Sequence, residues 1–436
     1  MVEDREPVLP FGSFLFPRVF RAFRMAIQPT KLILAFLAIT AVCVTGRVMD
    51  FNKTVGVIPS GMTELDAYVS GLMSAGDYVE AFTEAEEQHG VFSTLWNFGA
   101  QRFHGALTSL AQGNVLGVTQ NVAASFEALL WAFRYHTLYS VIFFAITLAV
   151  MSLAGGAICR IAALQFAQGE KPGLTEALQF GVRKFYSFLT APITPVAIIA
   201  VIGLFVVLLG LVGNIGYVGE LTVGLFLPLA LLAAALTAVI AIGALAGFNL
   251  MFPAIAYEDS DCFDAISRSF SYVYAEPWRM GFYTVIATIY GAICYAFVRF
   301  FAYLLLWITR QFLEFGFVKQ NAKLASIWPR PNFTDFLGSY AATPTNWSTS
   351  AGAFLIHVWV LVVVGLMVAF VISFYFCANT IIYALMRNRV DKTMLDEIYT
   401  GTDEMLAELS PAPASADKAA EAEPADEPEK PTATSE

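Results

Sequence analysis

Few residues in this chain combine the types and spacing that chemistry needs. The stretch GGAICRIAALQFAQGEKPGLTEALQF, residues 155–180, places Arg160 close in sequence to Glu170 and Glu176, directly after a long apolar segment. Carboxylates gathered around a cation are typical of acid–base or ion-handling sites. The competing interpretation is that such residues mark the point where an apolar helix leaves a membrane.

Known catalytic motifs do not occur in the sequence. It contains no GxxxxGK[ST], GxSxG, HExxH or dinucleotide-binding glycine pattern, so we predict neither an enzyme nor a cofactor. His89, His104 and His136 are not spaced four apart, and we predict no metal site. The five cysteines are far apart and form no CxxC pair, which indicates buried thiols rather than zinc ligands or disulfides.

Four residues inside or beside apolar segments form a candidate transport path, namely Arg299, His357, Asn249 and Asn379. Ionisable side chains within a membrane are expensive, so they are functional candidates by default. The alternative is structural: Arg299 and His357 lie near segment ends and can reach the interface, while the asparagines can hydrogen-bond between helices.

The composition explains why chemistry is scarce. Of the 436 residues, 57% are hydrophobic and only 14% are charged, against about a quarter charged in soluble domains. We therefore predict an all-α integral membrane protein, since six segments are apolar and long enough to cross a bilayer as helices. They lie near residues 30–49, 137–158, 190–213, 221–248, 280–300 and 353–384.

The distribution of lysine and arginine predicts the orientation. Placing both termini in the cytoplasm puts the basic residues of the short loops on the cytoplasmic side, as the positive-inside rule requires. The cytoplasmic N-terminus would then be residues 1–29 and the cytoplasmic C-terminal region residues 385–436. The residues that favour this arrangement are Arg5, Arg18, Arg21, Arg24, Lys31, Arg160, Lys171, Arg183, Lys184, Arg268, Arg279, Arg387, Arg389 and Lys392.

A short amphipathic stretch ending near a proline precedes each odd-numbered span. We predict three hairpins, each introduced by a helix lying in the plane of the membrane surface. The first such helix has Arg18, Arg21 and Arg24 on its polar face and Phe16, Val19, Phe20, Phe23 and Ile27 on its apolar face. We expect the three helices to end at Pro29, Pro192 and Pro277.

These in-plane helices give the charged residues a structural role. Asp261 is predicted as an N-cap with Asp264 at the third helical position, facing Arg268 one turn later. Glu176 takes the same third position after Gly173, and Arg160 reads as an anchor at the cytoplasmic interface. Residues 258–266 and 391–399 echo residues 170–178, which suggests one structural joint used up to three times.

The segments outside the spans complete the domain organisation. Residues 50–136 contain no strand-like alternation, so we predict a small helical insertion on the outer side. Residues 300–318 continue span five or form a second in-plane helix, before an outer loop at 309–352. The last residues, 400–436, hold ten acids against two lysines and are rich in proline and alanine, so we predict a disordered tail. An acidic tail also argues against nucleic-acid binding.

The segment FPAIAYEDSDCFDAISRSFSYVYAEPWRMGFY, residues 252–283, resembles a signature of uncharacterised bacterial polytopic membrane proteins. It is also similar to the membrane domain attached to bacterial glycerophosphodiesterases. The matching positions are Asp264, Ala265, Ile266, Arg268, Ser269 and Trp278. The resemblance implies about six spans and a bacterial cytoplasmic membrane, but no phosphodiesterase activity, because the soluble catalytic domain is missing.

Two functions from different classes follow from these observations. The first is a non-enzymatic membrane protein that organises or supports other components, in contact with the lipid bilayer and with other membrane proteins through the 50–136 insertion. The second is a permease or channel-like transporter of a small solute or lipid through the 137–384 core. A lipid-acting enzyme is a third reading, for which the sequence offers no catalytic group.

Overall fold

The computed structural model describes residues 16–58, 61–71, 82, 87–317, 321–333, 336 and 346–399. Six of its helices are long and apolar enough to cross a membrane, and the protein is an all-α polytopic membrane protein, as the composition predicts. They are α2 (Pro29–Met49), α7 (Thr137–Ala167), α9 (Phe185–Val212), α10 (Val218–Glu258), α12 (Pro277–Gly316) and α14 (Trp347–Val390).

Each predicted span coincides with one of these helices, apart from residue 213, which caps the end of α9, but most helices extend well beyond the predicted span. The 44 residues of α14 would measure about 66 Å at 1.5 Å per residue, roughly twice the thickness of a bilayer core. Residues 300–318 turn out to continue α12 without a break as far as Gly316. Apolar windows locate a helix, whereas its ends depend on packing that extends past the apolar stretch.

Short helices precede α2, α9 and α12, as the amphipathic stretches predict. They are η2 (Phe16–Phe20) with α1 (Arg21–Ala26), α8 (Leu174–Arg183) and α11 (Cys262–Ala275). Pro29 and Pro277 are the first residues of α2 and α12, where a missing amide hydrogen costs nothing. Pro192 was expected to end the second short helix; instead α8 ends at Arg183, and Pro192 lies inside α9.

The buried face of the first short helix also differs from the predicted one. Val19, Ala22 and Met25 are buried, whereas Phe20 and Ile27 are exposed. The first short helix packs on α14, and Phe23 takes part in this contact, with its ring centroid 5.8 Å from that of Phe370.

The same packing relation occurs three times. α8 packs on α7 and α11 packs on α10, so each short helix lies against the last helix of the hairpin before it. α1 packs on α14, which closes the series because α14 ends the third hairpin. The predicted echo at 391–399 is not a third such helix: it forms a turn after α14, and α1 occupies the position that this helix would take.

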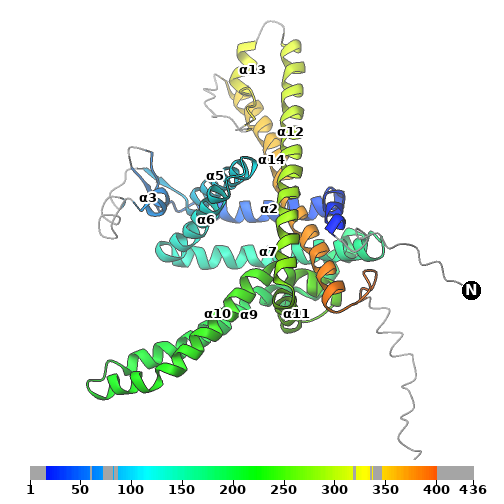
Figure 1. The fold of residues 1–436 in the computed structure, drawn as a ribbon. Coiled ribbons are helices and arrows are strands. Elements are labelled where there is room, and N and C mark those ends of the chain that lie inside the picture. Colours follow the sequence, from blue (N-terminus) through cyan, green and yellow to red (C-terminus); the bar gives the residue numbers. More distant parts are fainter. Residues whose placement is uncertain are drawn as a thin grey trace, which may run out of the picture. The chain divides into compact units, whose positions relative to one another are not determined.

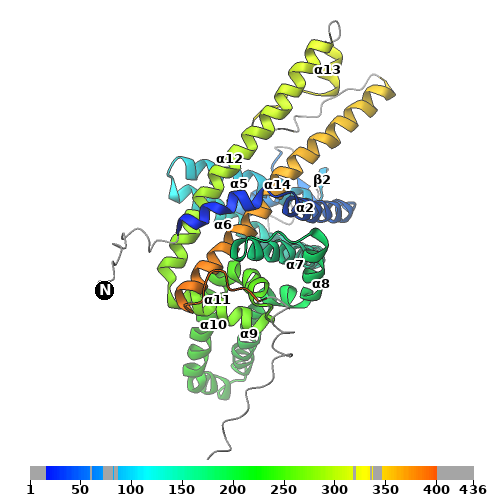
Figure 2. The same ribbon diagram turned by 90° about the vertical axis from the view of Figure 1, so that its right-hand side faces the viewer.

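The last parts of α7, α10 and α14 pack against one another and form the main core (Figures 1 and 2). We call residues 154–166, 250–258 and 369–387 the hub. Gly155 and Gly156 allow this approach, because a Cβ atom there would lie 2.4 Å from the ring of Phe376 and 2.5 Å from that of Phe188. The hub is thus built where small residues let helices meet.

The second hairpin leaves the hub as two paired helices that contact little else over most of their length (Figure 1). We call residues 196–242, which include the far parts of α9 and α10, the arm. The most apolar window of α10 has no buried residue, so its side chains are available to lipid.

The insertion between α2 and α7 contains α3 (Glu64–Ser70), α5 (Val91–Ala111) and α6 (Val115–Tyr135). It is mainly helical, as predicted, but β1 (Val55–Val57) and β2 (Glu87–His89) form an antiparallel pair that was not expected. The strands are three residues long, too short for an alternating pattern to be visible in the sequence. Residues 72–81 and 83–86 of the insertion lie outside the described residues.

Asp50, the residue after α2, fixes the insertion to the first span. Its carboxylate accepts the backbone N–H groups of Phe92 (2.9 Å) and Ser93 (2.8 Å), and so caps the start of α5 from 42 residues away. The hydroxyl of Tyr139 on α7 donates to the same carboxylate at 2.9 Å.

In the outer loop, α13 (Asn321–Ile327) packs on α14. The predicted disordered tail lies outside the described residues.

Candidate functional site

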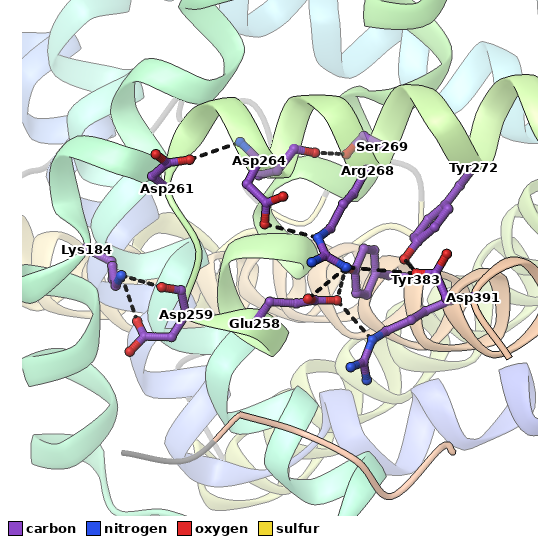
Figure 3. A network of polar contacts seen from close by, with 12 residues as sticks. Lys184, Glu258, Asp259, Asp261, Asp264, Arg268, Ser269, Tyr272, Tyr383 and Asp391 are labelled. Atoms are coloured by element: carbon purple, nitrogen blue, oxygen red, sulfur yellow. Dashed lines mark hydrogen bonds and ion pairs between the residues drawn. The ribbon is translucent and has the colours of Figure 1, made fainter. Parts of the chain in front are cut away.

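The hub ends in a network of charged and phenolic side chains centred on Glu258, the last residue of α10 (Figure 3). One carboxylate oxygen accepts the Tyr383 hydroxyl at 2.8 Å and faces Nε of Arg387 at 2.9 Å. The other oxygen faces Nη1 of Arg268 at 2.9 Å. Glu258 and Arg387 are each only 10% exposed, so this is a largely buried ion pair with a second cation at its edge.

Arg268 joins α11 to this network. Asp261 accepts the backbone N–H of Asp264 and is the N-cap of α11, and Asp264 in turn lies 3.0 Å from Nε of Arg268. Beyond Arg268 lies Asp391, which accepts a hydrogen bond from Tyr272. The predicted helix-start residues thus also orient the arginine that pairs with Glu258.

Asp259, the residue after Glu258, connects the end of α10 to a second element. It adopts a left-handed backbone conformation (φ 52°) that ends α10. Aspartate is one of the few residue types other than glycine that adopt this conformation. Its carboxylate forms ion pairs with Arg183 (2.8 Å) and Lys184 (3.0 Å), and its carbonyl oxygen also accepts from Lys184. The turn after α10 is therefore connected to the junction between α8 and α9.

Arg160, predicted as an interface anchor, is buried beside the end of α10. It is 9% exposed, and its Nη1 donates to the carbonyl oxygen of Ala256 at 2.8 Å, near the end of α10. Its guanidinium lies 4.7 Å from the ring centroid of Phe180 on α8. A buried arginine at a helix C-terminus satisfies carbonyl groups that have no partner within the helix. Glu176, by contrast, is exposed in the first turn of α8, where it interacts with the helix dipole.

The electrostatics of this network favour permanent ion pairs. Partial burial alone would lower the pKa of Arg268, but the carboxylates of Glu258 and Asp264 outweigh it and raise that pKa. Burial and the adjacent Asp391 raise the pKa of Tyr272. Both groups therefore keep their ordinary protonation states, and neither is prepared to exchange a proton near neutral pH.

A cavity of about 250 Å³ lies beside the hub, between α5, α10, α12 and α14. Asn249 and Asn379 both line it, and one polar atom of each is engaged: Asn249 Oδ1 accepts from the Tyr375 hydroxyl (2.5 Å), and Asn379 Nδ2 donates to the carbonyl oxygen of Tyr375 (2.9 Å). The remaining lining is predominantly apolar, including Phe103, Leu107 and Phe374. Such a cavity suits a hydrocarbon chain better than an ion.

The structure does not bring the four candidate path residues together. Arg299 donates to the carbonyl oxygen of Phe333 (2.9 Å), packs on the rings of Phe333 and Phe336, and is not among the residues that line the cavity. His357 is on α14 and does not line the cavity either. Only the two asparagines share one site.

The three histidines of the insertion have separate partners. His89 lies near Glu87, His136 is 3.9 Å from Glu64, and His104 faces Tyr295 on α12. Within the described ranges, no group of three histidine, cysteine or acidic side chains could hold a metal ion.

Glu258, Arg387 and Tyr383 were not singled out from the sequence. Glu258 aligns with Glu170 and Asp391, the first residues of the three similar segments. This repeated acidic position after an apolar helix is the one sequence feature that could have indicated a role for Glu258. Tyr383 and Arg387 lie one helical turn apart within α14, where only the fold shows that they face α10.

Comparison of the chain with protein-family models, with curated proteins and with solved structures gives no match. The resemblance of residues 252–283 to bacterial polytopic families stays a prediction.

Proposed function

We propose that this chain is a non-enzymatic protein of the bacterial cytoplasmic membrane that organises or supports other membrane components. The observation that carries the proposal is the closed state of its polar network, in which both oxygens of Glu258 are occupied by cationic or phenolic groups. A catalytic acid or nucleophile needs a free face toward a substrate. The hub fits a rigid joint instead.

The surface that would meet a partner is the exposed side of α6. Val115, Val122 and Phe126 lie at helical spacing on that side and are 75%, 46% and 58% exposed. Leu129, Leu130 and Phe133 extend the same stripe toward α7. An exposed apolar stripe of this kind is typical of an interface with another protein or with the membrane.

A photocrosslinking experiment in cells tests this role. A photoreactive residue at Phe126 should give a discrete crosslinked protein, whereas one at Gln120, on the polar side of α6, should not. The substitution Phe126→Asp with Leu130→Asp should remove co-purification of the same protein in mild detergent. Crosslinking only to lipid at Phe126, with co-purifying proteins unchanged in the double variant, would contradict the scaffold role.

The orientation with both termini in the cytoplasm is part of this proposal. The hub end gathers many of the basic residues that predicted it, including Arg160, Lys184 and Arg387. The insertion carries nine acids against three bases over residues 50–136, which suits the outer side. Reporter fusions after residue 398 and within residues 72–81 should report opposite sides of the membrane; the same side for both would refute the topology.

A permease or channel-like transporter of a small solute or lipid is the alternative function, and the cavity beside Asn249 and Asn379 is the observation that favours it. Its volume of about 250 Å³ would admit part of an acyl chain. Replacing Gly291, which lines the cavity, by Leu should then abolish lipid exchange between the leaflets of reconstituted vesicles. Vesicles with the unmodified protein that exchange lipid no faster than empty vesicles would exclude this alternative.

A further inference from the structure

A second cavity lies between the first short helix and the end of α7. It has a volume of about 680 Å³, and its walls come from η2 and α1 on one side and from residues 165–171 on the other. Three cationic side chains line it, Arg21, Arg24 and Lys171, together with the amides of Gln165 and Gln168. No aspartate or glutamate is among the residues that line it.

The three cations have no anionic partner within the described part of the chain. The ion pairs found there involve other basic residues, such as Arg268 and Arg387 in the hub. All three side chains are exposed, so they can reorient toward a ligand in the cavity. By contrast, Arg183, Arg268 and Arg387 each lie within 3 Å of an acidic side chain.

Lys31 adds an independent indication that an anion is missing. It is fully buried (0% exposed), and its amino group contacts the carbonyl oxygen of Met25 (3.1 Å), the side-chain oxygen of Gln165 (2.6 Å) and the thiol of Cys377, none of which is a carboxylate. Both Met25 and Gln165 also line the cavity. A buried ammonium is costly without a counter-charge, and an anion in the cavity would supply one.

The helix dipole of α7 opposes the binding of an anion in this cavity, but its effect is small. The cavity lies at the C-terminal end of α7, where the helix dipole is equivalent to about half a negative charge. Three lining cations outweigh it, before Lys31 is counted. The net potential in the cavity is therefore positive.

The shape and position of the cavity favour a lipid over a free ion. It lies beside the start of α2 and the end of α7, and the proposed orientation places these ends at the cytoplasmic surface of the membrane. Phe20 and Phe166 provide apolar walls beside the cations. Basic pockets between helices at the membrane surface bind the phosphates of anionic lipid headgroups.

We propose that this cavity binds the phosphate group of an anionic phospholipid, held by Arg21, Arg24 and Lys171. The site does not depend on the scaffold role of α6, and the two proposals can fail separately. In this arrangement a lipid joins the first short helix to α7, and so connects the ends of the first and third hairpins.

The test uses the full-length protein purified in mild detergent. Its melting temperature and its bound lipid, the latter by native mass spectrometry, are measured with added phosphatidylglycerol, with phosphatidylcholine and with inorganic phosphate. Phosphatidylglycerol should bind and raise the melting temperature, and phosphatidylcholine should do neither. Stabilisation by inorganic phosphate as well would identify a general phosphate site, whereas stabilisation by phosphatidylglycerol alone would identify a lipid headgroup site.

Three variants assign the effect to the cavity. The triple variant R21Q/R24Q/K171Q should bind phosphatidylglycerol about 100-fold more weakly, since each cation contributes about fivefold. The matched variant R18Q/R279Q/K392Q removes three cations that do not line the cavity and should bind like the unmodified protein. The charge-retaining variant R21K/R24K should keep most of the affinity.

Several results would overturn the proposal. One is equal binding of phosphatidylcholine, and another is an equal loss of phosphatidylglycerol affinity in both triple variants. The third is an affinity for phosphatidylglycerol that does not change with salt between 50 and 500 mM, roughly the range in which screening weakens exposed charges. The salt series needs only the unmodified protein, so it decides even if the triple variant fails to fold.

Discussion

One helix, α10, belongs to both the hub and the arm, and the two parts have opposite surroundings. Residues 250–257 are buried among α7 and α14, whereas the most apolar window of the same helix has no buried residue. Both parts are strongly apolar in sequence. Hydrophobicity alone therefore does not decide whether a residue of this protein contacts protein or lipid.

The difference lies in the small and polar residues. The hub contains Gly155, Gly156 and a set of fully paired charges, which let helices approach and then fix their register. The arm has glycines that meet nothing, such as Gly203 and Gly224, and its apolar side chains face outward. We conclude that the hub is held by close contacts among several helices, whereas the arm is held by the pairing of α9 with α10 and leaves most of its apolar side chains exposed.

The largest expected loss of stability comes from removing a buried charge of the hub, and it can be compared with the loss from removing a paired charge at the surface. Glu258→Gln should lower the free energy of unfolding by about 3 kcal/mol, because it leaves the buried Arg387 without its counter-charge. We take the low end of the usual range because Arg268 is more than a third exposed. Thermal unfolding in detergent measures the change.

Glu276→Gln is the matched control for that substitution. Glu276 also lies between two arginines, Arg279 (3.7 Å) and Arg389 (3.4 Å), but all three side chains are exposed by more than a third. Its loss should cost less than about 1 kcal/mol. Equal effects of the two substitutions would show that the Glu258 network is an ordinary surface cluster.

A pair of leucines on α10 gives the next largest contrast. Leu250→Ala, at a fully buried hub position, should cost about 2 kcal/mol through lost packing. The value is at the low end, because the unfolded helix in detergent still buries its leucines. Leu232→Ala, at an arm position 67% exposed, should change the melting temperature little. A similar loss at both positions would mean that the arm packs against protein, for example a second copy of the chain.

A pair of glycines should give effects of opposite sign. In Gly156→Ala the new methyl group meets the buried ring of Phe188, and we expect a net loss of about 1 kcal/mol after the gain in helix propensity. In Gly203→Ala nothing lies within 4 Å of the new Cβ, so the propensity gain remains. Stabilisation by both substitutions, seen in the same unfolding assay, would refute close packing in the hub.

The elements that depend on local sequence, such as apolar length and helix-capping residues, could be predicted. The six long helices follow from apolar length, and Pro29, Pro277 and the Asp261 cap follow from local backbone chemistry. The predicted end of the second short helix at Pro192 is wrong. Pro192 is the eighth residue of α9, and long membrane helices accommodate an interior proline because neighbouring groups can satisfy the freed carbonyl oxygen.

The composition of the hub could not be predicted in the same way. Arg160 reads as an interface anchor in sequence, because nothing local shows that Ala256 will present a carbonyl oxygen to it. Asn249 and Asn379 meet at one cavity while Arg299 and His357 do not line it, although all four looked alike as polar residues in apolar segments. Such pairings depend on which helix faces meet, and this is a property of the whole chain.

The smallest expected effect concerns pH and distinguishes the hub from the insertion. Among the described residues the hub contains no histidine, whereas His104 connects α5 to α12. Its Nδ1 must donate to the carbonyl oxygen of Ala100 (2.8 Å), so Nε2 accepts from the hydroxyl of Tyr295 (3.2 Å). Burial, together with the positive charge of Arg299, lowers the pKa of His104 below its ordinary 6.5, and burial also lowers the pKa of His136.

A histidine whose folded pKa is lowered contributes stability that is complete above the unfolded pKa and is lost as the pH falls through the folded one. Acidification from pH 7.5 to 5 crosses the ordinary pKa of histidine and so favours opened forms of the insertion in which His104 is protonated and no longer accepts from Tyr295. Hydrogen exchange in residues 91–111 should therefore increase. Exchange in residues 250–257 of the hub should not change over this range. The variant H104Q/H136Q should lose the pH response of α5, because glutamine does not titrate. A response that persists in this variant, or that extends equally to the hub, would contradict the idea that the insertion opens independently of the hub.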